Sequence, residues 1–194
     1  MREDRDRWTK KYRAAGFTAS FLPHPLAVRA LALPLPPGPV LDLASGPSGS
    51  ALLAAEAGRP SVAVDISEAA LSLLSEQART SALTGPLALV QADLDSWRPR
   101  PSTCALVLCT GYWEAGLFAA AAGAVMPGGM LAWEALTTEA LRRRPDMPGS
   151  WCLRPGEPAG LLPLAYEVLD EEDLPDGLPA TKRRMLARRR PEPE

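Results

Sequence analysis

Three short apolar runs of this sequence carry a carboxylate at or beside their carboxyl ends. Asp42 belongs to the first run, Asp65 ends the second and Asp93 follows the third, while Thr110 ends a fourth. Ligands of open α/β sheets bind outside the carboxyl ends of the strands. We therefore expect these side chains around one crevice, where carboxylates accept hydrogen bonds from hydroxyl and amine donors.

A Gly-rich turn follows the first of these runs. Gly46 and Gly49 bracket a Pro-Ser pair, and a helix-like segment, 50–57, begins directly after them. Such a turn lets the backbone pass close to a nucleotide-like ligand, but it is equally typical of an ordinary strand, turn and helix. Asp65 follows at crossover spacing, where dinucleotide-type folds place an acid against ribose hydroxyls. As an isolated residue it also fits a helix-start acid before the N-cap Ser67, so the pairing of the two motifs favours the ligand.

The chemistry of the crevice indicates which ligand it takes. Three carboxylates suit hydroxyl and amine donors and repel a pyrophosphate. The turn lacks the full GxGxxG spacing, and Asp42 lies where a phosphate would approach the first helix. S-adenosylmethionine has a ribose diol, an adenine amine, a cationic sulfonium and no phosphate, and we predict it as the cofactor, with no metal. A nicotinamide-binding or nucleotide-sensing Rossmann protein is the alternative from another class.

The elements that must position these residues alternate along the chain. Seven runs have the composition of strands, and they cover 40–43, 62–65, 87–91, 104–109, 130–136, 165–170 and 182–188. Five segments have helical patterns, and they cover 4–15, 26–33, 50–57, 67–82 and 115–125. Gly16 ends the first helix, and turns are expected at 127–129 and 175–177. The alternation predicts an α/β fold, a Rossmann-like three-layer sandwich around a seven-stranded, mostly parallel sheet with an antiparallel strand near the C-terminus.

Composition bounds the class of protein. The chain has 194 residues, 46% of them hydrophobic, which is enough for one substantial core, so we predict a single domain, 1–194. Within it, 1–38 form a helical N-terminal cap, 39–136 the cofactor-binding core, and 137–194 an acceptor-side segment with a C-terminal strand pair. Three cysteines without metal-type CxxC spacing favour reduced thiols over disulfides or a zinc site.

Charge and hydropathy bound its partners. A net charge of -2 provides no global basic field, so nucleic acid and anionic membranes are not expected partners. The charged N-terminus is unlike a secretory signal, and no run reaches the roughly 18 apolar residues of a membrane span. We therefore expect a cytoplasmic protein, monomeric or homodimeric, that acts on a small molecule.

At this point four strings of the sequence resemble one known family. VLDLASGPSG at 40–49, VAVDIS at 62–67, QADL at 91–94 and MPGGMLAWE at 126–134 are similar to motifs of the class I S-adenosylmethionine-dependent methyltransferases. Ser45 and Ser48 depart from the family's usual form, in which Cys or Gly is common. RWTKKY before the first strand and WCLRPGE after the fifth look like the small bacterial tellurite-resistance and thiopurine methyltransferase group.

The resemblance implies a role for each matching residue. Gly46 lets the backbone approach the cofactor, and Asp65 accepts hydrogen bonds from both ribose hydroxyls. Asp93 takes the adenine amine with Leu94 beside the ring, although an acid at that position is also typical of a simple turn cap. Asp42 helps to position the amino group. The other expected cofactor contacts are Trp8, Tyr12, Ala44, Ile66 and Thr110.

The acceptor is predicted from the chemistry of methyl transfer, an in-line displacement in which proximity and desolvation provide much of the rate. A thiol or other soft nucleophile needs little more, whereas a hydroxyl needs a base. His24, the only histidine, is the candidate base in a Pro-His-Pro turn, with a partly exposed turn histidine as the alternative. Glu114 is similarly ambiguous.

Aromatic side chains are the candidates for closing the pocket. We expect this of Trp8, Tyr12, Tyr112, Trp113 and Trp151, whose π faces suit a cationic sulfonium. For Trp133, inside the fifth strand, core packing is preferred. A protein of the same fold that binds S-adenosylmethionine without transferring its methyl group remains an alternative, with Ser45 and Ser48 in its favour.

Overall fold

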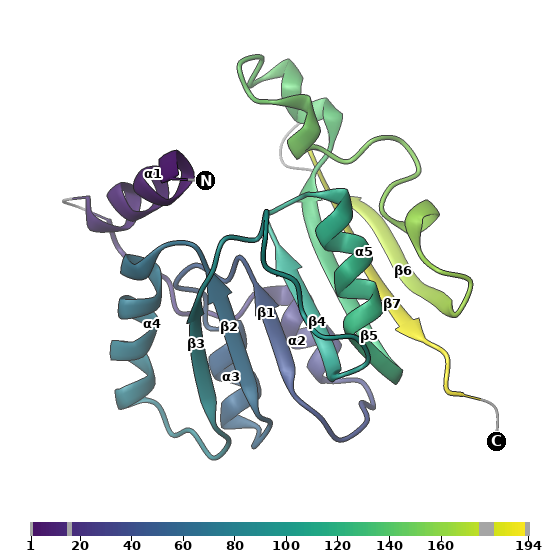
Figure 1. Cartoon of the computed structure of the whole chain (residues 1–194), viewed down its shortest axis with the longest axis horizontal. Helices are drawn as coiled ribbons and strands as arrows, with labels where there is room; N and C mark the ends of the chain where they lie inside the picture. Colours follow the sequence, from purple (N-terminus) through teal and green to yellow (C-terminus); the bar gives the residue numbers. More distant parts are fainter. Residues whose placement is uncertain (1, 15–16, 175–180, 193–194) are drawn as a thin grey trace.

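The strands of this computed structural model form one mixed sheet (Figure 1). The structure describes residues 2–14, 17–174 and 181–192. The strands are β1 Val40–Leu43, β2 Ser61–Asp65, β3 Leu87–Gln91, β4 Cys104–Thr110, β5 Val125–Leu136, β6 Tyr166–Leu174 and β7 Lys182–Arg189. Their order is β3-β2-β1-β4-β5-β7-β6, and β7 is antiparallel to both of its neighbours. The predicted fold class is confirmed, while Gly16 and the predicted turn at 175–177 lie outside the described residues.

Helices cover the two faces of the sheet unequally. They are α1 Arg2–Arg13, α2 Pro25–Leu31, α3 Ser50–Glu56, α4 Glu68–Thr80 and α5 Ala115–Ala124. The helices α2, α3 and α4 pack on one face and α5 on the other. In the acceptor-side segment the chain makes short 3-10 turns at Thr138–Arg142, Gly149–Trp151 and Ala159–Leu161.

Two local signals fix where helices begin. Ser67 accepts a hydrogen bond from the Ala70 amide and caps α4, as its residue type predicts. Glu114 accepts from the amides of Gly116 and Leu117 at the start of α5 and also pairs with Arg98. Glu114 is therefore an N-cap, which accounts for its position without a catalytic role.

Two tryptophans, Trp113 after β4 and Trp133 in β5, pack against the side of α5 that faces the core. Trp133 is fully buried and meets Phe118 edge to face, with 5.2 Å between ring centroids. Trp113 is only 5% exposed and packs against both of these rings. Trp133 is thus a core residue as predicted, but the prediction that Trp113 closes the pocket is wrong, because its neighbours in the core bury it.

The turn predicted at 127–129 is part of β5 instead. Cys104 pairs with Val125 and Leu106 with Met130. Between these two pairs the chain is five residues long in β5 and two residues long in β4. The extra residues form an irregular bulge in which Gly128 takes a φ of +80°. The turn chemistry of Pro-Gly-Gly is therefore used within the strand.

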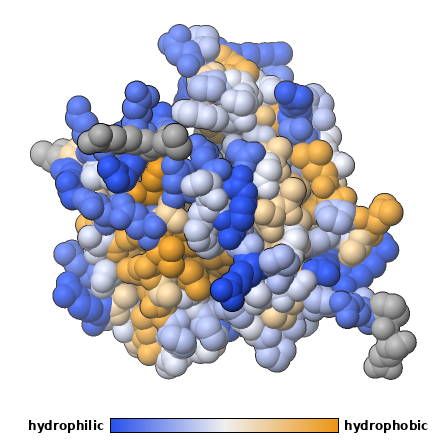
Figure 2. Space-filling view, in the orientation of Figure 1, coloured by the Kyte–Doolittle hydropathy of each residue, from blue (hydrophilic) through white to orange (hydrophobic). Residues whose placement is uncertain are grey.

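The alternation of strands and helices has one gap, which the predicted helices also leave. No α-helix lies between β3 and β4, where residues 92–103 form turns and irregular chain. Apolar side chains gather on the surface over β2 and β3 in Figure 2, where the register places Val62, Ala88 and Val90 on one face. None of the helices described is long and apolar enough to span a bilayer.

Candidate functional site

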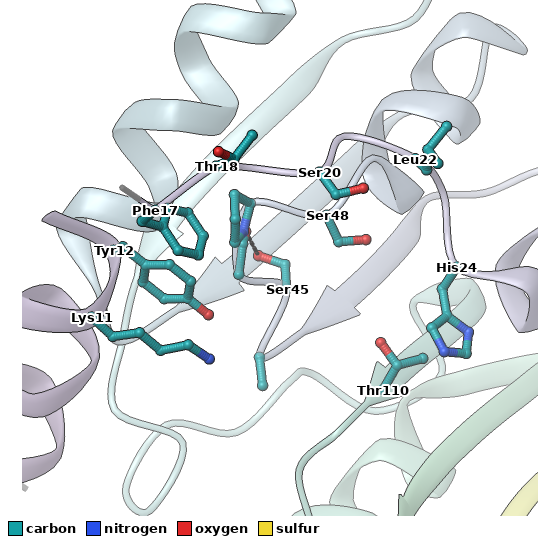
Figure 3. A pocket seen from close by; sticks show the side chains of 13 residues that line it. Lys11, Tyr12, Phe17, Thr18, Ser20, Leu22, His24, Ser45, Ser48 and Thr110 are labelled. Carbon is teal, nitrogen blue, oxygen red and sulfur yellow. Dashed lines mark hydrogen bonds between the residues drawn. The ribbon is translucent and has the colours of Figure 1, made fainter. Parts of the chain in front are cut away.

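A cavity of about 390 Å³ opens at the carboxyl ends of β1 and β4. It is lined by Lys11 and Tyr12 of α1, by the segment 17–24, by the loop 44–48 and by Thr110. We call the segment 17–24 the strap, because it crosses above the loop. Figure 3 shows Lys11 and Tyr12 on one side of the cavity and His24 and Thr110 on the other.

Asp65 lies behind Gly46, which lines the cavity, and is itself 6% exposed. The Gly46 amide donates to Asp65 Oδ2 at 2.8 Å, and the Ser67 amide donates to Oδ1 at 2.8 Å. Burial raises the pKa of Asp65, and the backbone amides partly oppose that shift. The Ile66 amide also bonds this carboxylate, so one of its roughly four acceptor positions is left for a hydroxyl of a ligand.

The two glycines of the turn have different roles. Gly46 has a φ of +53°, and a Cβ there would lie 3.0 Å from the Tyr12 hydroxyl. A Cβ on Gly49 would lie 1.8 Å from the carbonyl oxygen of Phe21. Gly46 therefore faces the cavity, whereas Gly49 makes room for the backbone of the strap.

The strap is tied to the start of α3. The His24 amide donates to Ser50 Oγ at 3.1 Å, and Ser50 Oγ lies 2.9 Å from Ser48 Oγ. Together with the contact at Gly49, these bonds place the strap's backbone where a dinucleotide phosphate would approach the helix. The arrangement disfavours the nicotinamide alternative.

The helix α1 forms the opposite wall. Tyr12 stacks on Trp8 with 6.0 Å between ring centroids, and Lys11 Nζ lies 4.4 Å from the centre of the Trp8 ring. Burial and the charge of Asp65 raise the pKa of Tyr12 to about 12, so its hydroxyl is protonated at neutral pH. The wall thus presents a hydroxyl and an ammonium group.

Three contacts hold α1 over the sheet. Thr9 Oγ1 lies 3.2 Å from Ser67 Oγ, and Arg13 pairs with Glu68. The Arg7 guanidinium lies 4.9 Å from the centre of the Trp151 ring. Through this last contact α1 reaches the acceptor-side segment.

Asp42 lies beneath the loop rather than in the cavity. It is 1% exposed, its carboxylate is bonded by the Ala51 amide, and Oδ2 has no hydrogen-bond partner. Burial and the charge of Asp65 raise its pKa to about 8, so the group is mostly protonated at neutral pH. The crevice is therefore less negative than its residue types indicate.

The other predicted residues divide into two groups. Thr110 lines the cavity together with Ala44, whereas Ile66 does not. Asp93 Oδ1 accepts from the Asp95 amide at 3.0 Å, as a turn cap does, and Leu94 is 6% exposed and packs in the core. Thr110, predicted near the methionine end of the cofactor, thus lines the cavity. The two residues predicted for adenine, Asp93 and Leu94, lie outside it.

Sequence reasoning missed Glu134. This carboxylate lies two residues before the end of β5, opposite Thr110 in the register, and its side chain is 4% exposed. Oε1 lies 3.4 Å from His24 Nε2 and 3.4 Å from Lys182 Nζ. Its signal, an acid near the carboxyl end of an apolar strand, is close to the one that identified Asp65.

The donor set offers little to a metal ion. Across the part of the chain that the structure describes, no three His, Cys, Asp or Glu side chains cluster in a way that would hold one.

Comparison with known proteins gives one family match and several structures of the same fold. Residues 40–129 match the family model of a methyltransferase domain, and no curated protein matches the sequence. An S-adenosylmethionine-dependent methyltransferase from Mesorhizobium loti is similar at a TM-score of 0.65 and 18% identity, covering 84% of this chain and 96% of that one. The geranyl diphosphate C-methyltransferase of Streptomyces coelicolor gives 0.62 and 14%, covering 84% and 75%.

A further similar structure comes from work on the conversion of a disulfide bond into a thioacetal group during echinomycin biosynthesis. Its TM-score is 0.66 at 17% identity, and the alignment covers 96% of this chain and 91% of that one. At such identities the structures establish the fold alone. Residues 40–129 therefore match a methyltransferase domain, and the whole chain shares the fold of S-adenosylmethionine-dependent methyltransferases of known structure.

Proposed function

We propose that this protein transfers the methyl group of S-adenosylmethionine to a small molecule, a thiol or other soft nucleophile. S-adenosylmethionine supplies an electrophilic methyl group on a cationic sulfur. The observation that carries the proposal is the Gly46–Asp65 pair, which joins a backbone turn at the cavity to a buried carboxylate that keeps an acceptor position beyond its bonds to three backbone amides. The protein's part is to hold the reacting groups close together in a cavity from which water is excluded.

The residues present fit this cofactor. Gly46 takes a φ of +53° that favours glycine and brings its backbone to the cavity beside the Tyr12 hydroxyl, and the protonated state of Asp42 limits the negative charge below the loop. Lys11 lines the cavity with its ammonium over the Trp8 ring, and it forms no ion pair with a described residue, so we assign it to the methionine carboxylate. Of the proposed cofactor contacts, four line the cavity, namely Tyr12, Ala44, Gly46 and Thr110. The others lie outside its lining, namely Trp8, Asp42, Asp65, Ile66, Asp93 and Leu94.

Two observations support a small acceptor at the far end of the cavity. Leu22 on the strap is 79% exposed and lines the cavity, which gives the entrance an apolar edge. His24 and Thr110 lie together at that end. The reaction at sulfur in the echinomycin work belongs to a protein that shares only the fold, and it supports thiols as the first probes.

The finer family assignment is also a proposal. We infer that the chain stands near the tellurite-resistance and thiopurine methyltransferase group, because the two segments that resemble it meet through Arg7 and Trp151.

Binding without transfer is the second candidate. Its support was Ser45 and Ser48, but Ser45 Oγ bonds the Gly46 carbonyl and Ser48 Oγ bonds the Ser50 amide. Both hydroxyls thus stabilise the loop, which weakens the case for a lost activity.

The test is a thermal shift with S-adenosylmethionine, S-adenosylhomocysteine and NAD, repeated on Asp65→Ala. A ligand at about a hundred times its Kd adds roughly 2.7 kcal/mol, or about 5 to 10 °C at this size. We expect stabilisation by the two sulfur ligands alone, and its loss in Asp65→Ala. A shift with NAD only, or with none of the three, would contradict the proposal.

A further inference from the structure

Glu134 is a buried charge beside the acceptor end of the cavity. Oε1 is shared by His24 and Lys182, and Oε2 lies 3.6 Å from Arg184 Nε. Burial alone would raise its pKa, but the hydrogen bond from His24 and the charges of Lys182 and Arg184 lower it below its ordinary value. The group is therefore an anion at neutral pH.

This anion fixes where the proton of His24 resides. An ionised carboxylate only accepts, so the Nε2 that faces it carries the proton. On the other side of the ring, Nδ1 accepts from the Leu26 amide at 3.2 Å and caps α2. An amide only donates, so Nδ1 must be the unprotonated nitrogen, and the two contacts require the same tautomer.

With both nitrogens engaged, His24 has no lone pair free for a ligand. It lines the cavity, yet an acceptor meets the ring without a basic nitrogen. To act as a base, His24 would have to release the Leu26 amide and give up the cap of α2. The other groups lining this end are hydroxyls, among them Thr110, which are not bases at neutral pH.

We propose that Glu134 is a positioning residue, because it holds His24 in this tautomer. The acceptor end of the cavity is therefore left without a general base. The inference rests on the proposed methyl transfer and narrows its acceptors to nucleophiles that ionise unaided, namely thiols. The thiol loses its proton to water, and its sulfur then forms the new S–CH₃ bond. The electron pair of the broken sulfonium bond stays on the departing sulfur, which becomes a neutral thioether.

The first experiment observes His24 directly. Because the chain has one histidine, ¹⁵N-edited NMR of the labelled protein reports this ring without assignment. We expect a hydrogen-bonded Nε2–H signal that Glu134→Gln weakens or removes and that the exposed control Glu139→Gln leaves in place. An Nδ1–H signal, or an Nε2–H signal indifferent to Glu134→Gln, overturns the proposal.

The second experiment measures methyl transfer against pH for thiophenol and benzyl mercaptan, with phenol and benzyl alcohol as their oxygen counterparts. The thiols should react, with kcat/KM rising as each thiol ionises, so that the midpoint moves with the acceptor. His24→Asn keeps an oxygen that can cap α2; it should lower the rate by about tenfold or less and leave these midpoints in place. A base contributes about 10²–10⁴-fold, so a larger loss with a changed profile would overturn the proposal.

The failures of the two proposals are distinguishable. If S-adenosylhomocysteine does not stabilise the protein, the methyl transfer itself is wrong. If it does, and an oxygen compound is methylated in place of the thiols or no probe reacts, the narrowing to thiols is wrong while cofactor binding stands.

Discussion

Asp42 shows how far burial changes a residue's chemistry. Its pKa of about 8 means that, between about pH 4 and 8, the folded protein binds a proton that the unfolded chain does not. The unfolding free energy therefore falls as pH rises through this window, by at most about 1.4 kcal/mol per pH unit. Asp42→Asn lacks this loss, so its stability relative to the wild type should increase from pH 5.5 to 7.5.

Urea denaturation at the two pH values measures this difference. The exposed Asp146→Asn is the control. An equal stability gap at both values for Asp42→Asn would mean that Asp42 is already ionised at pH 5.5.

We predict that the Lys11 ammonium binds the carboxylate of the cofactor. Lys11→Met should weaken S-adenosylhomocysteine about tenfold, the size of one charged hydrogen bond. Binding of 5′-methylthioadenosine, which lacks that carboxylate, should stay unchanged. Calorimetric titration of both ligands checks the pair, with Lys10→Met, exposed on the same helix, as the control. If the binding of both ligands were weakened equally, Lys11 would only shape the wall of the cavity and would not bind the carboxylate.

The sequence was informative about single residues where one local rule decides. Gly46 was predicted from its place in the turn after the first strand, and Asp65 from its place at the end of the second. Both predictions depend only on the local course of the backbone. The pairing of Glu134 with His24 joins residues 110 positions apart and depends on how the strap crosses the sheet. For Asp93 the sequence leaves both a ligand role and a turn-cap role open. In the structure its carboxylate accepts from the Asp95 amide, as a turn cap does.

At the scale of elements, the close passage of the strap over α3 gives a sharp test. In Gly49→Ala the new methyl group meets backbone, which has no rotamer to escape into, so we expect a loss of about 2 kcal/mol or more and weaker cofactor binding. Gly123→Ala in α5 meets nothing within 4 Å and should be neutral or stabilising by up to about 1 kcal/mol. Urea midpoints compare the two. Similar midpoints would mean that the strap is free to move off the loop.

Elements were predictable where periodicity and caps agree. The strands of the parallel core and the start of α4 follow from apolar runs and from Ser67. The bulge in β5 was not predictable, because Pro-Gly-Gly has the same composition in a turn and in a bulge, and only the pairing partner decides. The sequence indicates no helix in 92–103, but the apolar residues of β2 and β3 alone do not show which face of the sheet such a gap leaves uncovered.

At the scale of the whole molecule, α1 connects the cofactor side to the acceptor side. Tyr12 meets Gly46, and Arg7 meets Trp151, so a bound cofactor should keep α1 closed. Trypsin should cleave at Arg7 several-fold more slowly with S-adenosylhomocysteine, because cleavage follows the open population. Trp151→Ala should speed this cleavage, and Leu164→Ala, 97% exposed elsewhere, should not. Cleavage indifferent to ligand and to Trp151 would show that α1 closes independently of both.

The C-terminal strand pair has one more consequence. β6 is the edge of the sheet, and its sequence YEVLDEEDL places five acids there, with Asp173 and Glu172 paired to Arg183 and Arg184 of β7. An open edge is a template for pairing with another chain, and repulsion between two such acidic edges opposes it. The protein should therefore resist edge-to-edge aggregation at neutral pH, and lose that resistance in acid or at high salt, where the acids are neutralised or screened.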